Sequence, residues 1–268
     1  MDCPDTSPPT MMQRILTSDF VFDFTRAPLA MLAAAVVLFL FIIAILAPLV
    51  APTNPFDPAS LNLMNGFTPP MTPNMFTGQS FVMGADDQGR DLLSAIIYGL
   101  RVSLFVGVMS VLLAMGIGVS LGLVAGYVGG WLDNLIMRIA DIQLTFPSIL
   151  IAMLIFGVLR GIIPPDLRDE MAIFVLIAAI GLSEWVPFAR TVRATTLVEK
   201  EKEYVQAARL IGLRRGQIMW RHILPNVIGP VLVIATITLA LAIIAEATLS
   251  FLGVGAPPTE PSLGTLIR

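Results

Sequence analysis

Residues Glu199–Asn226 read EKEKEYVQAARLIGLRRGQIMWRHILPN and form the longest strongly charged stretch of an otherwise apolar chain. The region 190–221 holds eight of the sixteen Lys and Arg residues, namely Arg190, Arg193, Lys200, Lys202, Arg209, Arg214, Arg215 and Arg221. Long hydrophobic runs flank it on both sides. Because charged side chains are costly in a bilayer, this charged segment must be in water. Its position in water is the starting point for assigning the membrane spans and their orientation.

The composition predicts an integral membrane protein. Of the 268 residues, 56% are hydrophobic and only 13% are charged, and the mean hydropathy is +0.84. Soluble domains carry about 25% charged residues. We therefore predict an all-α, polytopic membrane helix bundle, with the amino terminus in the cytoplasm for the reason given below.

Five apolar runs are candidates for membrane spans, at about 28–50, 102–128, 138–159, 171–189 and 223–246. The first, Pro28–Val50, has 23 residues without a charge. A signal-peptide core has about 7–15 residues, so we interpret this run as an uncleaved span. The predicted organisation is a cytoplasmic segment at 1–26 followed by a transmembrane domain at 27–268.

Charge placement predicts the orientation. If residues 1–26 lie in the cytoplasm, so does the loop 190–222 with its eight cations. The regions then outside, 51–101 and 160–170, hold only Arg90, Arg101, Arg160 and Arg168. The opposite orientation would violate the positive-inside tendency.

Several local features carry more specific expectations. Six prolines between Ala51 and Ser80 should block regular structure in the external loop. The helical spacing of apolar residues at 92–100 suggests a short helix on the membrane surface that leads into the second span; a solvated loop is the alternative. Glycines throughout 102–132 favour a closely packed, buried bundle helix.

The third and fourth spans contain residues that are unusual in lipid. Arg138 and Asp141 lie one helical turn apart and can pair. Pro147 predicts either a bend beside a pathway or an ordinary packing kink. Glu184 and, at the end of the fifth span, Glu246 are candidate pathway residues, because intramembrane carboxylates are costly. Glu184 can alternatively snorkel to the interface.

Other chemistry is excluded by residue counts. Cys3 and His222 are the only residues of their types, which excludes a disulfide framework, a cysteine zinc site and a two-histidine metal motif, so we expect no metal. Neither Lys200 nor Lys202 follows a glycine-rich phosphate loop, so if ATP drives this protein, another subunit must bind it. A membrane-embedded protease would need paired catalytic groups, whereas the candidate carboxylates lie on different segments. We expect a protein that is not an enzyme and has no catalytic residues.

Within the charged segment the pattern predicts two short helices joined near Gly212, which would end the first helix in a left-handed conformation. Glutamates at the front suit a helix N-terminus. Ala207 and Ala208 would form a small, flat patch that fits a groove on another protein. A basic loop resting on anionic lipid headgroups is the alternative, but it does not explain the glutamates or the alanine-glycine spacing.

The sequence then resembles a known family. Residues 206–225 follow the pattern Gln-Ala-Ala-x3-Gly-x9-His-x-Leu-Pro, which is similar to the EAA loop of ABC importer permeases, with Gln206 in place of Glu and His222 in place of Ile. GADDQGRD (84–91), DIQLTFPS (141–148), RHILPN (221–226) and LSFLGVG (249–255) resemble the second permease subunit of dipeptide, oligopeptide and nickel importers. The resemblance runs from about residue 28 to the end.

The resemblance implies a coupling helix that docks on a cytoplasmic ATPase, with the coupling residues Glu203, Gln206, Ala207, Ala208, Arg209, Gly212, Leu213 and Arg214. The implied partners are a second homologous permease, two ATPase subunits that bind ATP and Mg, an extracytoplasmic substrate-binding protein and membrane lipid, but no nucleic acid. The implied location is the bacterial inner membrane. Family members have a sixth span, for which this sequence contains no candidate.

Peptide is the expected substrate. Nickel chelates, glutathione and opines remain alternatives, as does a channel or membrane scaffold without ATP coupling. His222 could sense pH, but a structural histidine at a helix end is the simpler interpretation.

Overall fold

The computed structural model describes residues 24–55, 63–74, 78, 80–255, 257 and 262–267. Most of the predicted cytoplasmic segment 1–26 lies outside these residues. The helices are α3 (Pro28–Ile45), α4 (Ala47–Val50), α5 (Leu92–Val128), α6 (Gly130–Leu144), α7 (Ser148–Ile162), α8 (Arg168–Ser183), α9 (Trp185–Glu199), α10 (Glu203–Leu210), α11 (Arg215–Gln217), α12 (Leu224–Phe251) and α13 (Leu263–Ile267).

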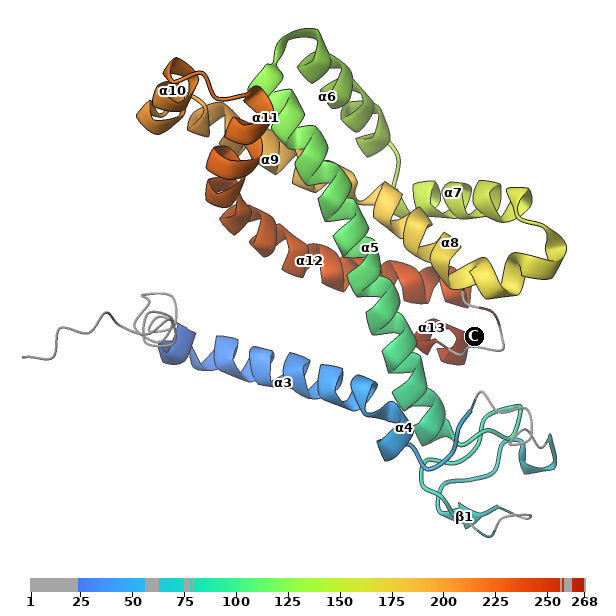
Figure 1. The fold of residues 1–268 in the computed structure, drawn as a ribbon. Helices are drawn as coiled ribbons and strands as arrows, with labels where there is room; N and C mark the ends of the chain where they lie inside the picture. Colours follow the sequence, from blue (N-terminus) through green and yellow to red (C-terminus); the bar gives the residue numbers. More distant parts are fainter. Residues whose placement is uncertain are drawn as a thin grey trace, which may run out of the picture.

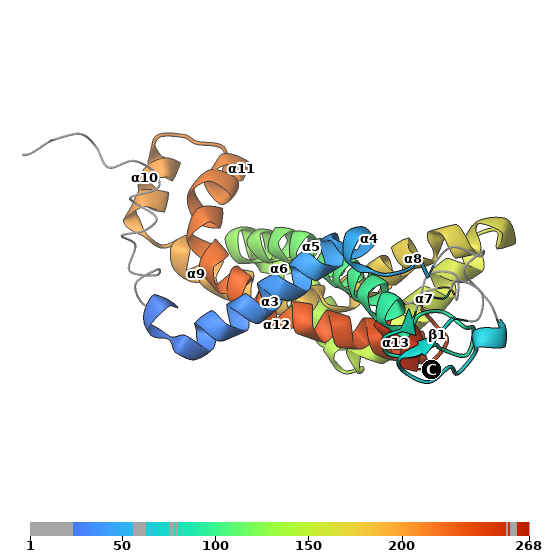
Figure 2. The same ribbon diagram turned by 90° about the horizontal axis from the view of Figure 1, so that it is seen from below.

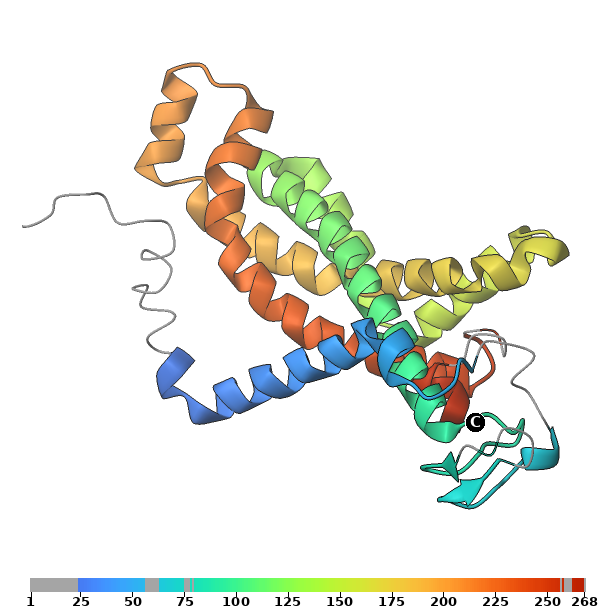
Figure 3. The same ribbon diagram turned by 60° about the horizontal axis from the view of Figure 1, so that its bottom comes forward.

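The long helix α5 is the centre of the fold. It runs through the middle of the molecule, and α8, α9 and α12 pack along it (Figure 1). The charged segment, with α10 and α11, projects at one end of the molecule, and the loop that carries β1 lies at the other end (Figure 2). By contrast, α3 extends away from the bundle (Figure 3), and Ala44 is its only buried residue.

The prediction of a separate surface helix before the second span was wrong. The Asp91 side chain accepts a hydrogen bond from the Ser94 backbone N–H and caps α5, which then continues unbroken for 37 residues. At 1.5 Å per residue this is about 55 Å, well beyond the ~30 Å hydrocarbon core. Nothing between Leu92 and Leu104 interrupts the helix, so the amphipathic spacing belongs to the end of the span itself.

The prediction that glycines allow close helix packing is confirmed where α5 meets α9. A Cβ atom added at Gly122 would lie 2.5 Å from the Ala189 carbonyl oxygen, so only glycine permits this approach. Gly118 and Gly126 face the same helix. Such small residues bring backbones together where lipid supplies no hydrophobic driving force.

The third and fourth predicted spans are each broken in two. The axes of α6 and α7 differ by 99° across the Thr145–Pro147 break, and those of α8 and α9 differ by 40° at Glu184. Pro147 cannot donate a helical hydrogen bond, which accounts for the first break. In the part of the chain that the structure describes, three single helices are long and apolar enough to cross a membrane, and the number rises to as many as five when each bent pair counts as one span.

The last span begins where the sequence predicted, since α12 starts at Leu224 with Pro225 in its first turn. A π-helical turn, η4 (Ile218–Ile223), joins the charged segment directly to it. As the prolines predicted, the described part of the loop after α4 contains only small elements, namely a 3₁₀ turn, η2 (Leu63–Asn65), and the antiparallel pair β1 (Thr72–Pro73) and β2 (Ser80–Phe81). A further 3₁₀ turn, η3 (Pro165–Leu167), precedes α8.

Candidate coupling and translocation site

The charged segment has the predicted helix–turn–helix form. The first helix, α10, begins with Glu203, whose negative charge suits the helix N-terminus. It ends at Leu210, and Gly212 then adopts a left-handed backbone with φ 81°. A side chain at this position would be strained, so the glycine lets the chain reverse into α11.

The structure divides the predicted coupling residues into exposed and buried sets. Glu203, Gln206, Ala207, Arg209, Gly212 and Arg214 are exposed, and Leu213 is half-buried. Ala208, however, is only 4% exposed and packs in the core with Val205 and Ile218. The predicted flat patch of two alanines was therefore wrong, because α10 turns Ala208 inward.

Two apolar side chains at the tip of the segment were missed by the sequence analysis. Leu210 is 88% exposed and Ile211 is 75% exposed. Leu210 is the last residue of α10, and Ile211 follows it directly before Gly212. Their position directly before a left-handed glycine was the available signal, since a turn at that point carries neighbouring residues away from the core.

Polar contacts fix the base of the segment. The Tyr204 hydroxyl donates to Glu199 Oε2 at 2.6 Å, Lys202 Nζ donates to Glu199 Oε1 at 2.6 Å, and Asn226 Nδ2 donates to the Tyr204 oxygen at 3.1 Å. Glu199 ends α9 and Asn226 lies on α12, so Tyr204 ties both ends of the segment together. The pKa of Tyr204 is raised to about 12, mainly because the hydroxyl is partly buried and to a smaller extent because it donates a hydrogen bond to Glu199.

Gln206 and Arg209 hold α10 in place. Gln206 Nε2 donates to the Glu201 carbonyl at 2.9 Å, so the amide closes the turn before the helix. The Arg209 guanidinium lies over the Tyr127 ring, 5.1 Å from its centroid. This contact links α10 to the end of α5.

Three polar contacts join α6 to α9, and we call them the α6–α9 ladder. Arg193 Nη2 donates to Asp133 Oδ2 at 2.7 Å, Arg190 pairs with Asp141, and Trp185 Nε1 donates to Gln143 Oε1 at 2.8 Å. The predicted pairing of Arg138 with Asp141 was therefore wrong. Helix α9 lies alongside α6 and supplies the arginine, a contact that sequence spacing alone does not reveal.

The ladder ends where the two broken spans meet. Gln143 Nε2 donates to the carbonyl oxygens of Leu182 at 3.1 Å and Ser183 at 2.9 Å, at the end of α8. Glu184, half-buried in the break itself, is hydrogen-bonded by the Ser148 side chain at the start of α7. Pro147 and Glu184, two of the predicted pathway residues, are thus brought to one place.

Glu246, the third predicted pathway residue, is fully buried elsewhere. Ser103 Oγ donates to its Oε2 at 2.6 Å and Ser250 Oγ to its Oε1 at 2.8 Å. The Leu263 backbone N–H in turn donates to Ser103 Oγ at 3.3 Å. In this conformation the Glu246 carboxylate joins α5, α12 and α13 instead of facing an open space.

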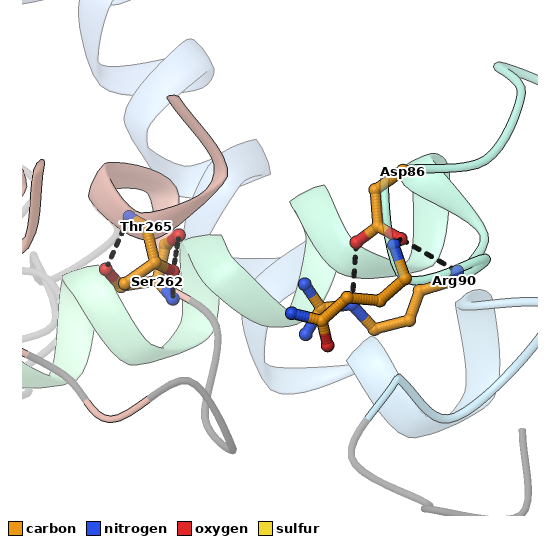
Figure 4. Close-up of polar contacts among 5 residues, drawn as sticks. Asp86, Arg90, Ser262 and Thr265 are labelled. Atoms are coloured by element: carbon orange, nitrogen blue, oxygen red, sulfur yellow. Dashed lines mark hydrogen bonds and ion pairs between the residues drawn. The ribbon is translucent and has the colours of Figure 1, made fainter. Parts of the chain in front are cut away.

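A cavity of about 800 Å³ is lined in part by residues of the loop before α5 and of α13. Both lie at the end of the molecule opposite to α10 (Figure 2). Asp87, Arg160 and Asp169 are among the charged residues that line it. One wall is a turn organised by Asp86, which accepts from Arg90 Nε at 2.6 Å, and another is α13, where Ser262 and Thr265 bond to each other (Figure 4). Among the described residues, no group of three or more His, Cys, Asp or Glu gathers as metal ligands would.

Comparisons with known proteins identify relatives over most of the chain. Residues 118–268 match the family described as "Binding-protein-dependent transport system inner membrane component", and residues 16–70 match the "N-terminal TM domain of oligopeptide transport permease C". The chain is 36% identical to the dipeptide transport system permease protein DppC of Haemophilus influenzae, over 97% of this chain and 84% of that protein.

Two further relatives have related names. The oligopeptide transport system permease protein OppC of Bacillus subtilis is 35% identical, over 94% of this chain and 76% of its own length. The glutathione transport system permease protein GsiD of Escherichia coli is 38% identical, over 93% of this chain and 76% of its own length.

Proposed function

Since this chain belongs to the family of binding-protein-dependent transport system inner membrane components, we propose that it is one permease subunit of an ABC importer that takes up short peptides. The relatives are named for dipeptides, oligopeptides and glutathione, itself a short peptide. The proposed complex contains a second, homologous permease, two cytoplasmic ATPases that bind ATP and Mg, and an extracytoplasmic binding protein.

The observation that carries the coupling part of the proposal is the exposed tip of the charged segment. Ala207, Leu210 and Ile211 present small and apolar surface on a helix whose base is fixed by Tyr204 and Asn226. A contiguous exposed apolar patch that is rimmed by polar residues is typical of a protein-binding surface. In the proposed mechanism this tip sits in a groove of an ATPase subunit, and closure of the two ATPases on ATP displaces it.

The opposite end of the molecule supports a role in substrate entry. The cavity there is within the size range of small-molecule sites. It is lined by carboxylates and by the guanidinium groups of Arg90 and Arg160, which complement the ammonium and carboxylate groups of a zwitterionic peptide. With the charged segment in the cytoplasm, this cavity opens to the outside, where a binding protein would deliver its cargo.

Co-purification of the ATPases with permease variants tests the coupling surface. Leu210→Asp and Ile211→Asp should leave the permease in the membrane but reduce ATPase recovery at least about tenfold, since burying an unpaired charge at an interface costs more than about 1.4 kcal/mol. Ala208→Asp would be uninformative, because Ala208 is buried and its replacement disturbs the loop itself.

Leu63→Asp is the matched control, because Leu63 is 78% exposed but lies in the loop at the other end of the molecule. It should recover the ATPases like the unmodified protein. Equal recovery with all three variants would rule out the tip as the docking surface.

A further inference from the structure

Gln143 makes hydrogen bonds to two backbone carbonyls and one side chain at the point where two spans break. Its Oε1 accepts from the Trp185 indole N–H, and this leaves its amide group to donate to the Leu182 and Ser183 carbonyls. The two carbonyls belong to the last turn of α8, whose terminal carbonyl groups have no helical partner. One side chain from α6 therefore holds the end of α8 and the start of α9 together.

The other contacts of the α6–α9 ladder hold α6 and α9 together, so that the two helices should move as one rigid body. The Arg193–Asp133 pair lies at the end of the ladder near the charged segment, and the Gln143–Trp185 contact lies at the break. Asp133 is only 13% exposed at its side chain, so solvent screens this pair less than a surface pair. Helix α9 leads directly into the charged segment through Lys200.

Beyond the breaks, α7 and α8 pack against each other as a hairpin that projects to one side of α5, and α8 packs against α5 (Figure 1). The bends of 99° and 40° leave both connections to this hairpin without continuous helical hydrogen bonding. Ser148 and Glu184 provide the second polar contact across the same point.

We infer that the α6–α9 ladder is a lever that carries displacement of the charged segment to both breaks at once, with Gln143 as the positioning residue that sets the angle of the α7–α8 hairpin. This inference rests on the proposed function, because it needs a partner that moves the charged segment. A contiguous chain of packed and hydrogen-bonded elements is the physical means by which two distant sites are coupled.

The test measures the number of peptides taken up per ATP hydrolysed by the complete importer in proteoliposomes, with glutathione and a labelled dipeptide as probes. Gln143→Leu keeps the size of the side chain but removes all three hydrogen bonds, and Trp185→Phe removes one. Both should lower the ratio, by roughly 2- to 30-fold for the former, while ATPase association is unchanged. Should Gln143→Leu fail to accumulate, Trp185→Phe answers the same question.

Charge exchange tests the other end of the lever. Asp133→Arg and Arg193→Asp should each lower the ratio, and the double variant should restore it. Ser120→Ala is the control, because Ser120 bonds only within α5, to the Gly116 carbonyl at 2.7 Å. An unchanged ratio in Gln143→Leu and Trp185→Phe, or an equal loss in Ser120→Ala, overturns the inference.

Spin-label distances provide a readout that a merely structural role would not alter. With Cys3 replaced by Ser, labels at the exposed positions Leu135 on α6 and Val198 on α9 should keep one distance with and without ATP. Labels at Leu154 on α7 and Val198 should change distance on ATP binding, and Gln143→Leu should abolish that change. A change between positions 135 and 198 contradicts the lever. If the unmodified complex shows no ATP-dependent uptake, the proposed function itself fails, and the inference with it.

Discussion

At the scale of single residues, the Tyr204 hydroxyl makes the stability of the charged segment depend on pH. A raised pKa means that folding favours the protonated phenol, which donates to Glu199. The stability from this contact is complete below the ordinary pKa near 10 and is lost as the pH rises through about 12. The contact is therefore intact throughout the physiological range.

A difference titration checks this expectation. The phenolate absorbance of the unmodified protein minus that of Tyr204→Phe should show a transition near pH 12, well above that of an ordinary tyrosine. A difference transition near pH 10 would mean that the Glu199 contact is absent in solution.

Glu246 is the second residue whose role follows from its contacts. Glu246→Ala removes the acceptor for the buried Ser103 and Ser250 hydroxyls. We expect a loss of about 1–3 kcal/mol in the free energy of unfolding, since buried donors are left unpaired. Thermal unfolding in detergent measures the effect. Thr236→Ala on the same helix, where the hydroxyl bonds only to the Val233 carbonyl, should have little effect.

At the scale of elements, the α5–α9 contact sets how the bundle is packed. Gly122→Ala places a methyl group 2.5 Å from the Ala189 carbonyl oxygen, so α5 and α9 must separate. We expect a destabilisation of about 1–3 kcal/mol. Gly116 on the same helix has open space around its Cβ position, and Gly116→Ala should be neutral or stabilising by up to about 1 kcal/mol. Equal melting temperatures for the two variants would contradict the observed packing.

At the scale of the whole molecule, the positive-inside distribution predicts which end faces the cytoplasm. With Cys3 replaced by Ser, Asp166→Cys in the turn between α7 and α8 should react with an impermeant maleimide in intact spheroplasts. Leu210→Cys in the charged segment should react only after the membrane is permeabilised. The opposite pattern would invert the orientation and remove the basis for ATPase docking on this segment.

Much of the architecture followed from the sequence alone. Apolar runs indicated the helices, because a bilayer demands long uncharged segments. Gly212 indicated the turn after α10, because few other residues adopt a positive φ. The alanine-glycine spacing and the order of the other motifs indicated the family, which the comparisons confirm.

Tertiary structure alone decided the rest, because it depends on which helices become neighbours. Helical spacing made Arg138 the expected partner of Asp141, but α9 lies alongside α6 and supplies Arg190 instead. Ala208 was expected at a docking surface, yet α10 turns it into the buried core that also contains Ile218. Gln143 was part of the DIQLTFPS motif, but sequence patterns assigned it no role, since a single polar residue near a span end has many possible partners. Only the meeting of α6, α8 and α9 makes its amide the link between two broken spans.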